Sequence, residues 1–412
     1  MGFGLLGEKL GHSYSPLIYQ HFGLQDYALY EVPPDQVEAF LRSGGLQGLN
    51  VTIPYKKTAL SLCDTLSPAA RRLGNVNLLR FDAQGRIHGD NTDYEGFSQL
   101  LEYMGVSPKG KKAVVLGSGG AAQTVAAVME ERGASSVVHI SRRGRDHYGN
   151  LEKHRDAALL VNATPVGMYP QVEESPVSLE HFPGLEGVLD LVYNPLRTRL
   201  VLEARSRGIP AVGGLWMLAA QGWAAAQVFL NRAIPPEGTQ SVHAALLQSM
   251  ENIALVGMPG SGKSTLGKAL ARSMGRPFVD VDDLVREDTG RTPEEIITQD
   301  GEAAFRDIES RLLRGAAKQS GIVLATGGGA VLREENRTAL RMNSRVYWRK
   351  RPLEALETGN RPLSKDLPGL YEARRALYEA VSDVTVDESQ SPEEAARQVR
   401  EEFDEHTRAQ RP

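Results

Sequence analysis

A glycine-rich loop past the middle of the chain constrains the fold more than any other feature. Residues 257–265 read Gly-Met-Pro-Gly-Ser-Gly-Lys-Ser-Thr and satisfy the pattern G-x-x-x-x-G-K-[ST] in full. We expect a strand at Ile253–Val256 before the loop and a helix that begins at Lys263 after it. In this order the backbone N–H groups cradle phosphate oxygens, Lys263 reaches the β- and γ-phosphates, and Ser264 holds Mg²⁺. The sequence therefore predicts a nucleotide site made by Gly260, Ser261, Gly262, Lys263, Ser264 and Thr265.

A second glycine-rich turn follows the apolar run Ala113–Leu116. Gly117-x-Gly119-x-x-Ala122 precedes an Ala/Val-rich stretch, which gives the strand–turn–helix context of a dinucleotide-binding unit. Glycines let the backbone approach a pyrophosphate, and the helix N-terminus adds N–H donors and a positive dipole end. The predicted contacts are Gly117, Gly119, Gly120 and Ala121. A tight turn without a ligand is the alternative.

The residues after the next strand favour one dinucleotide over the other. We expect a strand at Ser136–Ile140, and it is followed by Ser141, Arg142 and Arg143. An NAD site would place an acidic residue there for the ribose hydroxyls. Two arginines suit a 2′-phosphate instead, so NADPH is the predicted cofactor and these three residues are its predicted contacts. A solvated basic turn is the alternative.

Composition and length exclude several classes of protein. At 412 residues the chain should form about two to three domains. The net charge of −4 gives no reason to expect a nucleic acid or an anionic membrane as partner. Cys63 is the only cysteine, which excludes an internal disulfide and fits a reducing cytosol. The N-terminus lacks a signal-peptide pattern, and the most apolar stretch, Leu215–Leu230, is too short to span a membrane. We expect a soluble cytoplasmic protein with small-molecule substrates.

Short β-branched runs alternate with helical stretches along the chain, a pattern typical of α/β folds with parallel sheets. Further strands are expected at Phe3–Gly7, Gly48–Val51, Leu159–Val161 and Gly187–Asp190, and a helix at Ser241–Met250. A domain boundary is expected near residues 248–252, and a second division near residue 105.

Lys56 and Asp93 are the candidate proton-handling pair of the N-terminal half. A dinucleotide that delivers hydride to a ketone carbon requires a proton at the ketone oxygen. A desolvated lysine beside a carboxylate can deliver that proton. The spacing does not show that the two residues meet. A surface lysine and an Asx-turn aspartate are the alternatives.

Two aspartates follow the first helix of the C-terminal half. We expect a strand at residues 278–282, in which alternation places Asp280 and Asp282 on the same face. One carboxylate could serve the water shell of the metal, and the other could bind and deprotonate an acceptor hydroxyl. Helix capping by both acids is the alternative.

Three more features of the C-terminal half could contact a ligand. Arg306 and Glu309 would be neighbours on a helix, a spacing that is most often a surface ion pair. The run Gly327-Gly328-Gly329 would permit close backbone approach to a ligand, or would form a plain loop. Arg361 lies in a polar stretch that could close as a lid.

Five motifs occur in order within residues 1–250. They are His-Ser-Tyr-Ser-Pro at 12–16, Asn-Val-Thr-Ile-Pro-Tyr-Lys at 50–56, Asn-Thr-Asp-x-x-Gly at 91–96, Asn-Ala-Thr-Pro-x-Gly-Met at 162–168 and Gly-Leu-x-Met-Leu-x-x-Gln at 214–221. This order resembles that of the shikimate dehydrogenases. The resemblance implies that Lys56 is the catalytic lysine, with Asp93 beside it. It implies that shikimate is held by Ser13, Ser15, Thr52, Lys56, Asn77, Asp93 and Gln221, with Tyr193 lining the cleft and Leu191 and Gly214 on the nicotinamide side.

The N-terminal half departs from that family in two places. The family's Gly-Ala-Val-Asn-Thr reads Gly74-Asn75-Val76-Asn77-Leu78 here, which keeps the asparagine and loses the threonine. The stretch from Ser141 to Asn162 is also shorter than the family usually carries. We therefore expect a trimmed βα unit in the cofactor domain and altered contacts to the adenosine.

The features of residues 252–400, with Arg374-x-x-Leu377-Tyr378 added, resemble the shikimate kinases. The resemblance implies ATP and Mg²⁺ as ligands, with Ser264 and Asp280 at the metal. It implies that Asp282 binds the diol and acts as base, and that Arg306 and Arg374 clamp the carboxylate of shikimate. Gly328 would add a backbone contact, and Arg361 would steady the transferring phosphate. The segment 348–361 is a few residues shorter than in the family, and Glu357 lies near the place of a usual arginine.

The two resemblances imply consecutive reactions: NADPH-dependent reduction of 3-dehydroshikimate, then MgATP-dependent phosphorylation of shikimate to shikimate 3-phosphate. The expected enzyme is bifunctional and belongs to aromatic amino-acid biosynthesis. Its expected domains are a shikimate-binding lobe at 1–105, with helices of 215–250 packing back on it, a Rossmann-type NADP lobe at 106–214, and a P-loop kinase domain at 252–412 with a parallel sheet and a lid.

Three alternatives stay open from the sequence. The C-terminal half could bind a nucleotide without turnover and regulate a shikimate or quinate dehydrogenase; the retained Lys263, Asp282 and Arg306 argue against this. The first half could prefer quinate and NAD, against which Arg142 and Arg143 argue. The second half could be a gluconate-type kinase, although two arginines fit a ring that carries a carboxylate better.

Overall fold

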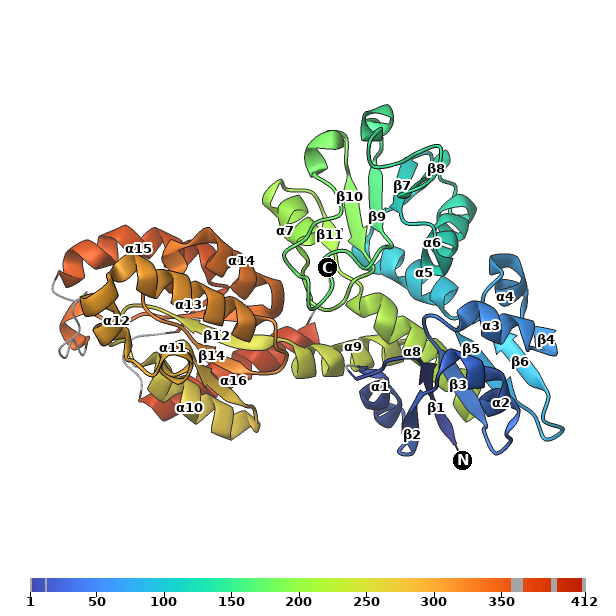
Figure 1. The fold of residues 1–412 in the computed structure, drawn as a ribbon, viewed down its shortest axis with the longest axis horizontal. Coiled ribbons are helices and arrows are strands. Elements are labelled where there is room, and N and C mark those ends of the chain that lie inside the picture. The colour runs from blue at the N-terminus through green and yellow to red at the C-terminus, as the bar shows by residue number, and fades with distance from the viewer. Residues whose placement is uncertain (1, 12, 357–365, 387–390, 410–412) are drawn as a thin grey trace. The chain divides into compact units, whose positions relative to one another are not determined.

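The computed structural model describes residues 2–11, 13–356, 366–386 and 391–409. The chain forms two compact units. Unit 1 comprises the chain up to Tyr193 together with Leu200–Leu246, and unit 2 comprises Asn194–Arg199 and the chain from Leu247 on. Figure 1 labels the elements of both units. Within the described ranges, no helix is both long and apolar enough to cross a membrane.

The first sheet of unit 1 has six strands in the order β2-β1-β3-β5-β6-β4. Their bounds are β1 Phe3–Gly7, β2 Tyr27–Glu31, β3 Gly48–Val51, β4 Thr65–Leu66, β5 Leu78–Phe81 and β6 Ile87–Asp90. The helices that accompany it are α1 Ser15–His21, α2 Val37–Arg42, α3 Lys56–Ser61 and α4 Pro68–Leu73. The alternating pattern predicted parallel sheets, but β5 runs antiparallel to both β3 and β6. Only residues 82–86 join β5 to β6, which is too short for a parallel crossover, so these two strands pair as a hairpin.

The second sheet of unit 1 is entirely parallel, in the order β11-β10-β9-β7-β8. Its strands are β7 Lys112–Leu116, β8 Ser136–Ile140, β9 Leu159–Asn162, β10 Gly187–Asp190 and β11 Ala211–Val212. Helix α6 Gly120–Glu131 follows β7, and α7 Arg199–Ser206 follows β10. Between β8 and β9 the chain forms only a short 3₁₀ turn, Leu151–His154. This is the trimmed connection that the short sequence between these strands predicted.

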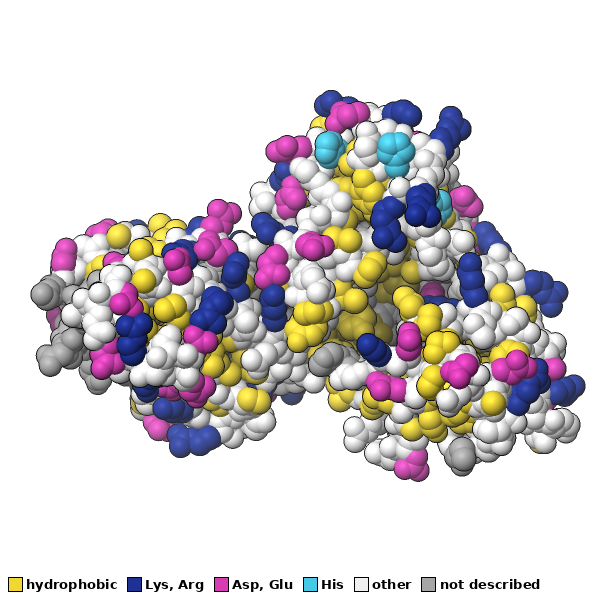
Figure 2. Space-filling view, in the orientation of Figure 1, with side chains coloured by type: hydrophobic (Ala, Val, Ile, Leu, Met, Phe, Trp, Pro, Cys, Tyr) yellow, Lys and Arg dark blue, Asp and Glu magenta, His cyan; other side chains and the backbone are white. Residues whose placement is uncertain are grey.

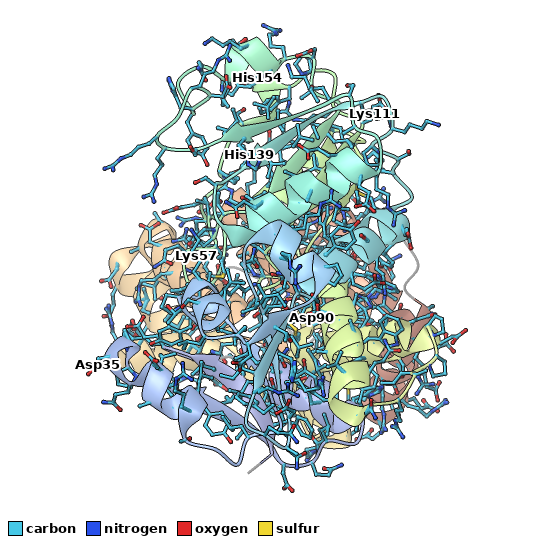
Figure 3. The ribbon with its side chains drawn as sticks, turned by 90° about the vertical axis from the view of Figure 1, so that its right-hand side faces the viewer. Asp35, Lys57, Asp90, Lys111, His139 and His154 are labelled. Carbon is cyan, nitrogen blue, oxygen red and sulfur yellow. The ribbon has the colours of Figure 1, made fainter. Side chains whose placement is uncertain are left out.

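Three long helices complete unit 1: α5 Asp93–Met104, α8 Leu215–Leu230 and α9 Glu237–Met250, of which the residues up to Leu246 belong to this unit. Helix α8 packs closely on α5 at Gly96, where an added Cβ would lie 2.6 Å from Cγ of Gln221. Residues of α5 also share a buried core with Ala113 and Val115 of β7. Helix α5 thus joins the two halves of unit 1, which Figure 3 shows with the sheet of Asp90 below and that of His139 above.

Unit 2 is built on a five-stranded parallel sheet in the order β13-β14-β12-β15-β16. Its strands are β12 Asn252–Val256, β13 Phe278–Asp280, β14 Val323–Ala325, β15 Ser344–Arg349 and β16 Val384–Val386. All five residues of the central strand β12 are buried, as expected for a parallel strand that is covered on both faces. Its helices are α10 Lys263–Met274, α11 Val281–Thr289, α12 Pro293–Asp300, α13 Glu302–Ala317, α14 Glu334–Asn343, α15 Leu367–Val381 and α16 Pro392–Ala409.

One predicted strand is too long. The sequence suggested that residues 278–282 are extended, but β13 ends at Asp280 and α11 begins at Val281. The cause is local, because the Asp280 side chain accepts a hydrogen bond from the Asp282 N–H at 3.0 Å. An aspartate in this position is a strong helix N-cap. The capping alternative is therefore correct for Asp280, whereas Asp282 lies in the first turn of α11.

Candidate active sites

The candidate residues of unit 1 gather at one edge of its mixed sheet. Strands β1, β3 and β6 run in the same direction, and their carboxyl ends lead to Ser13 and Ser15, to Thr52 and Lys56, and to Asp93. Strand β5 runs the other way, so that Asn77 precedes it at the same edge. Ligands of open α/β sheets commonly bind at the carboxyl ends of strands. The topology therefore brings together residues that are spread over eighty positions of the chain.

Lys56 and Asp93 form an ion pair, with 2.5 Å between Lys56 Nζ and Asp93 Oδ2. The Asp93 side chain is only 5% exposed and that of Lys56 is 22% exposed. Asn77 Nδ2 donates to the other carboxylate oxygen, Oδ1, at 2.9 Å. Because Asp93 is the first residue of α5, the positive end of the helix dipole also favours its negative charge. The surface-lysine and plain-turn alternatives are wrong for this pair.

Asn91 supports this pair and was not assigned a role from the sequence. Its Oδ1 accepts the Asp93 N–H at 3.0 Å, and its Nδ2 donates to Asn75 Oδ1 at 2.6 Å. Asn75 replaces the family's usual alanine, and an added Cβ at Gly120 would lie 3.4 Å from Asn75 Nδ2. An asparagine two residues before a helix-starting aspartate is an Asx-turn signal, which could have identified the role of Asn91.

The other predicted substrate residues of unit 1 lie on the elements around this pair. Ser13 Oγ accepts the Ser15 N–H at 3.2 Å, which shapes the loop before α1. The Thr52 N–H donates to Leu6 O at 3.0 Å, so Thr52 extends the pairing of β3 with β1. Gln221 packs from α8 on Gly96 of α5. The Tyr193 ring lies edge-on to that of Tyr14, with 6.4 Å between the centroids, and burial raises the pKa of Tyr193.

The surface of unit 1 is hollowed where its two sheet-containing parts meet, and Figure 2 shows hydrophobic side chains gathered in that hollow. Two large apolar residues of the candidate motifs are exposed, Ile53 at 79% and Met168 at 43%. Ile53 lies within the Thr-Ile-Pro-Tyr-Lys motif, and Met168 ends the motif after β9. Exposed apolar side chains within a hollow are typical of a ligand cleft.

The glycine-rich turn after β7 leads directly into α6. Gly117 has a φ of +115°, and a Cβ there would lie 3.1 Å from the Ala163 carbonyl oxygen. Gly119 is the N-cap of α6, which begins at Gly120 and continues through Ala121. The turn therefore presents free N–H groups at a helix N-terminus, the arrangement that binds a pyrophosphate.

Ser141, Arg142 and Arg143 follow β8 at the edge of the parallel sheet. Ser141 Oγ donates to the Arg143 carbonyl at 2.6 Å, and both arginine side chains are exposed. Burial raises the pKa of Tyr148, and the nearby charge of Arg142 opposes this rise. On the far side of the sheet, a Cβ at Gly214 would collide with the Leu191 carbonyl. Glycine at position 214 thus lets α8 begin against the chain that leaves β10.

The phosphate loop of unit 2 surrounds its lysine. Lys263 begins α10, and its Nζ donates to the carbonyls of Gly257 and Met258 at 2.9 Å each. Gly260 and Gly262 have φ of +76° and +83°, in the left-handed region that favours glycine. Ser264 Oγ donates to Asp280 Oδ2 at 2.6 Å. A hydroxyl and a carboxylate together fit Mg²⁺, which takes one or two protein oxygens and completes its shell with water and phosphate.

A cavity of about 220 Å³ lies in front of this loop. It is lined by most of the predicted kinase residues, which are Gly260, Gly262, Lys263, Ser264, Thr265, Asp280, Asp282, Arg306, Gly328 and Arg374. The predicted contact Ser261 is itself part of the loop and is buried. Arg361 lies outside the described residues. The cavity joins the phosphate loop to two aspartates, two glutamates and two arginines, so a phosphate donor and a small acid could both enter it.

The Arg306–Glu309 pair is buried, so the surface alternative is wrong. Arg306 Nη1 donates to Glu309 Oε2 at 2.6 Å, and Arg306 Nη2 donates to Glu302 Oε1 at 3.1 Å. The two side chains of the first pair are 10% and 0% exposed. Burial raises the pKa of Glu309, against the charge of Arg306. Burial opposes ionisation of Arg306 as well, but Glu309 and Glu302 raise its pKa above the ordinary value.

Tyr378 supports the glycine-rich segment of this cavity. Its hydroxyl donates to the Gly328 carbonyl at 2.5 Å, and burial raises its pKa to about 12. Arg374 lies one helical turn before it in α15 and is only 4% exposed. A Cβ at Gly329 would collide with the guanidinium of Arg306. The glycines therefore let the backbone approach the side chains of Arg306 and Glu309, and contact with a ligand stays a prediction.

Two family models match this chain. The model described as "Shikimate dehydrogenase substrate binding domain" matches residues 5–79, and that described as "Shikimate kinase" matches residues 259–404.

Among curated proteins, the shikimate dehydrogenase (NADP(+)) of Methanopyrus kandleri is 39% identical over 267 residues, which cover 57% of this chain and 91% of the relative. The enzyme of the same name from Clostridium perfringens is 34% identical over 265 residues, which cover 59% of this chain and 97% of the relative.

Solved structures agree with these matches. A chorismate mutase/shikimate 5-dehydrogenase fusion protein from Clostridium acetobutylicum has a TM-score of 0.56 and 34% identity, covering 60% of this chain and 96% of that one. Shikimate 5-dehydrogenase from Thermus thermophilus in complex with NADP(H) and shikimate has a TM-score of 0.53 and 34% identity. The match covers 60% of this chain and 99% of that one. The chain therefore belongs to the shikimate dehydrogenase family in its N-terminal half and carries a shikimate kinase domain in its C-terminal half.

Proposed function

We propose that this chain catalyses two consecutive reactions, the NADPH-dependent reduction of 3-dehydroshikimate to shikimate and the MgATP-dependent phosphorylation of shikimate to shikimate 3-phosphate. Residues 1–105, with helices from 215–250, form the shikimate-binding lobe of the first enzyme. Residues 106–214 form its NADP lobe, and residues 252–412 form the kinase.

One observation carries the first reaction: the partly buried Lys56–Asp93 pair at the sheet edge that also carries Ser13, Thr52 and Asn77. NADPH, when bound, supplies a hydride to the ketone carbon. Lys56 donates the proton that the ketone oxygen then needs, and Asp93 holds the ammonium in position for that transfer. Asn77 fixes the opposite oxygen of Asp93, so the carboxylate cannot rotate away from Lys56.

The cofactor assignment rests on charge. Arg142 and Arg143 are exposed at the end of β8, where they can pair with a 2′-phosphate. The glycine-rich turn and the N-terminus of α6 would receive the pyrophosphate. Gly214 and Leu191 would border the nicotinamide.

The second reaction is supported by the cavity of unit 2. Asp282 lies there with Lys263, Arg306 and Arg374. Asp282 accepts the proton of the attacking hydroxyl, and the two arginines bind the carboxylate of shikimate as planar forks. Lys263 and the loop N–H groups stabilise the charge on the transferring phosphoryl group, and Ser264 and Asp280 hold Mg²⁺.

A coupled assay tests the whole proposal. The purified chain is given 3-dehydroshikimate, NADPH, ATP and Mg²⁺, and shikimate 3-phosphate is detected by mass spectrometry. Lys56→Ala should abolish reduction and leave phosphorylation of added shikimate intact, and Lys263→Ala should do the reverse. A wild-type chain that binds ATP but never forms shikimate 3-phosphate would support a regulatory C-terminal half instead. Loss of both activities in either variant would contradict two independent sites.

A further inference from the structure

The chain that follows β8 forms a closed loop of residues 141–150, named the arginine loop. Ser141 and His147 pair in an isolated parallel bridge, so the residues between them form the tip of the loop. The Ser141 N–H donates to the Asp146 carbonyl at 3.4 Å, and the Ser141 hydroxyl donates to the Arg143 carbonyl at 2.6 Å. The backbone path of the tip is therefore fixed by bonds within the loop itself.

The tip carries three positive charges and one negative charge, on Arg142, Arg143, Arg145 and Asp146. The three arginine side chains are exposed. A carboxylate this close along the chain to three guanidinium groups is attracted to all of them. Among the residues that the structure describes, however, none of these arginines forms an ion pair. Something other than an arginine must therefore hold the carboxylate of Asp146.

That partner is His154, which Figure 3 labels and which ends the 3₁₀ turn Leu151–His154. His154 Nε2 lies 3.0 Å from Asp146 Oδ1, and the ring donates because an ionised carboxylate can only accept. The His154 side chain is 9% exposed and that of Asp146 is 23% exposed. The other ring nitrogen, Nδ1, is buried and has no hydrogen-bond partner within the described ranges. The ring is thus oriented toward Asp146.

Packing keeps His154 in place beside the arginine loop. Leu151 of the same turn is 5% exposed and lies in a buried core of the parallel sheet, against which Tyr148 also packs. Asn150, just before the turn, donates from Nδ2 to the Arg145 carbonyl at 3.0 Å. The turn and the loop are therefore held together by apolar contacts and by a backbone bond, independently of the contact between His154 and Asp146.

We propose that His154 is a specificity-determining residue for the dinucleotide: by binding the Asp146 carboxylate, it keeps that acid away from Arg142 and Arg143 and leaves both guanidinium groups available to a 2′-phosphate. A released carboxylate would compete with the phosphate for the arginines and would repel the phosphate directly. His154 acts through Asp146 and does not touch the cofactor. The inference rests on the proposed use of NADPH in the first reaction.

The test measures the Kd of the full chain for NADPH and for NADH by fluorescence titration, at low ionic strength, where exposed charges are screened least. His154→Leu releases Asp146. His154→Leu/Asp146→Asn releases the same side chain without its charge. His154→Leu/Asp156→Asn is the matched control, because Asp156 is close to His154 in sequence but pairs with Lys112, outside the arginine loop. Thermal scans first establish that each variant is folded. If His154→Leu is not, His154→Phe, which keeps a ring at this position, takes its place throughout.

We expect His154→Leu to weaken NADPH binding about three- to tenfold, because competition from an exposed ion pair and repulsion of the phosphate are each modest. Binding of NADH, which lacks the 2′-phosphate, should be unchanged. Removing the charge of Asp146 should return the Kd for NADPH to within about twofold of wild type, whereas removing that of Asp156 should not.

A purely structural role for His154 predicts a loss that persists in both double variants, and that result would overturn the inference. Unchanged NADPH binding in His154→Leu, or recovery in both double variants, would do so as well. A wild-type chain that binds NADPH no more tightly than NADH would instead refute the cofactor assignment on which the inference rests.

Discussion

Lys56 and Asp93 are 37 positions apart in the sequence, yet Lys56 Nζ donates to Asp93 Oδ2 at 2.5 Å and Asp93 opens helix α5. Both follow the carboxyl ends of strands that run in the same direction in one sheet. Asn77 and Asn91 hold the remaining polar atoms of Asp93. The lysine is therefore aimed by a carboxylate whose other oxygen is bound by Asn77 and whose backbone N–H is bound by Asn91.

Replacing that carboxylate tests whether it aims the lysine. Asp93→Asn keeps the shape and loses the charge, so we expect the dehydrogenase kcat to fall about 10²- to 10⁴-fold, the usual worth of a positioned proton donor. Steady-state oxidation of shikimate with NADP⁺ measures this. Asp82→Asn is the control, because Asp82 makes a turn with Arg86 and Gln84 away from the site. A kcat of Asp93→Asn equal to that of Asp82→Asn would remove Asp93 from the mechanism.

Cofactor choice should depend on Arg142. A charged hydrogen bond contributes about 1.5–3 kcal/mol, so Arg142→Ala should weaken NADPH binding about tenfold to a hundredfold. Binding of NADH, which lacks the 2′-phosphate, should be unchanged. Fluorescence titration with both dinucleotides measures this, and Arg155→Ala, a change at an exposed arginine paired with Glu152, is the control. Equal losses for the two cofactors would refute the assignment of the 2′-phosphate to Arg142.

Much of the fold follows from the sequence because its strands are short apolar runs bounded by turn residues. Strands β1, β3, β8 and β10 begin and end where the pattern predicted, and α10 begins at Lys263 as the phosphate-loop motif required. The exceptions have local causes. A side-chain cap by Asp280 ended β13 early, and the antiparallel direction of β5 depends on pairing partners that periodicity does not reveal.

The candidate sites were predictable as motifs but not as contacts. A spacing of three predicts that Arg306 and Glu309 are neighbours, but cannot show that the pair is buried. Burial comes from the glycines of the segment after β14, which let the backbone approach both side chains. His154 had no motif at all, because a lone histidine does not reveal that it binds Asp146 on the loop before it.

Substrate binding by the kinase should depend on the planar fork of Arg306. Arg306→Lys keeps the charge and loses bidentate geometry, so we expect the KM for shikimate to rise about tenfold or more, one charged hydrogen bond being worth about 1.5–3 kcal/mol. The KM for ATP should stay near wild type. Kinase assays at saturating ATP measure this, with Arg286→Lys at an exposed arginine of α11 as control. An unchanged KM for shikimate would exclude Arg306 as a carboxylate clamp.

Stability should depend on the buried partner of Arg306. Glu309→Gln leaves a buried guanidinium with only the half-exposed Glu302 as its acid. Breaking a buried ion pair from one side typically costs about 3–5 kcal/mol, and we expect a loss near the lower limit because Glu302 remains. Urea unfolding of the full chain, monitored through the loss of kinase activity, measures this free energy of unfolding. Glu302→Gln should cost much less, and equal costs would show that burial of Glu309 does not matter.

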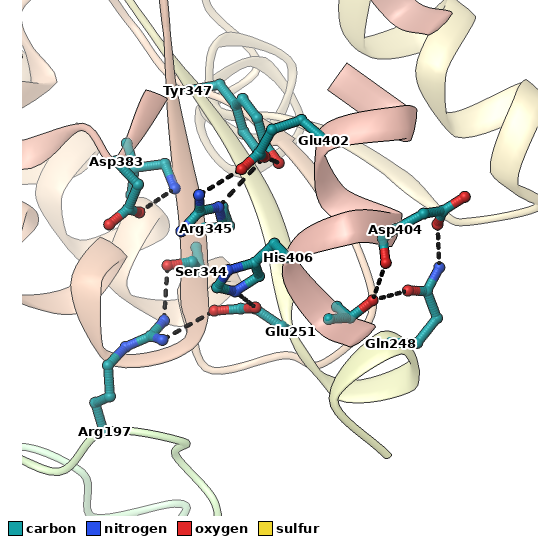
Figure 4. Close-up of polar contacts among 12 residues, drawn as sticks. Arg197, Gln248, Glu251, Ser344, Arg345, Tyr347, Asp383, Glu402, Asp404 and His406 are labelled. Carbon is teal, nitrogen blue, oxygen red and sulfur yellow. Dashed lines mark hydrogen bonds and ion pairs between the residues drawn. The ribbon is translucent and has the colours of Figure 1, made fainter. Parts of the chain in front are cut away.

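The charge of Glu251 should make part of the stability depend on pH. The groups that face it are Arg197, His406 and Arg276, and Figure 4 shows the first two at its carboxylate. Burial opposes ionisation, but Arg197 and His406 hold the pKa of Glu251 below its ordinary value. A carboxyl group with a lowered pKa in the folded state stabilises that state above its unfolded pKa, which is about 4.3. This stability is lost as the pH falls through the lower, folded-state pKa.

Glu251→Gln removes that dependence, because the amide does not titrate in this range. We expect wild type to be clearly more stable than the variant at pH 7, and the difference between them to shrink as the pH is lowered below about 4. Urea titrations between pH 3 and pH 7, monitored by circular dichroism, measure the free energy of unfolding of both chains under identical conditions. Carboxylates that do not contact Glu251 titrate equally in both, so the difference reports Glu251 together with its partners Arg197 and His406. A difference that stays constant or grows on acidification would mean that Glu251 is neutral in the folded chain, and that its bond to Arg197 is not an ion pair.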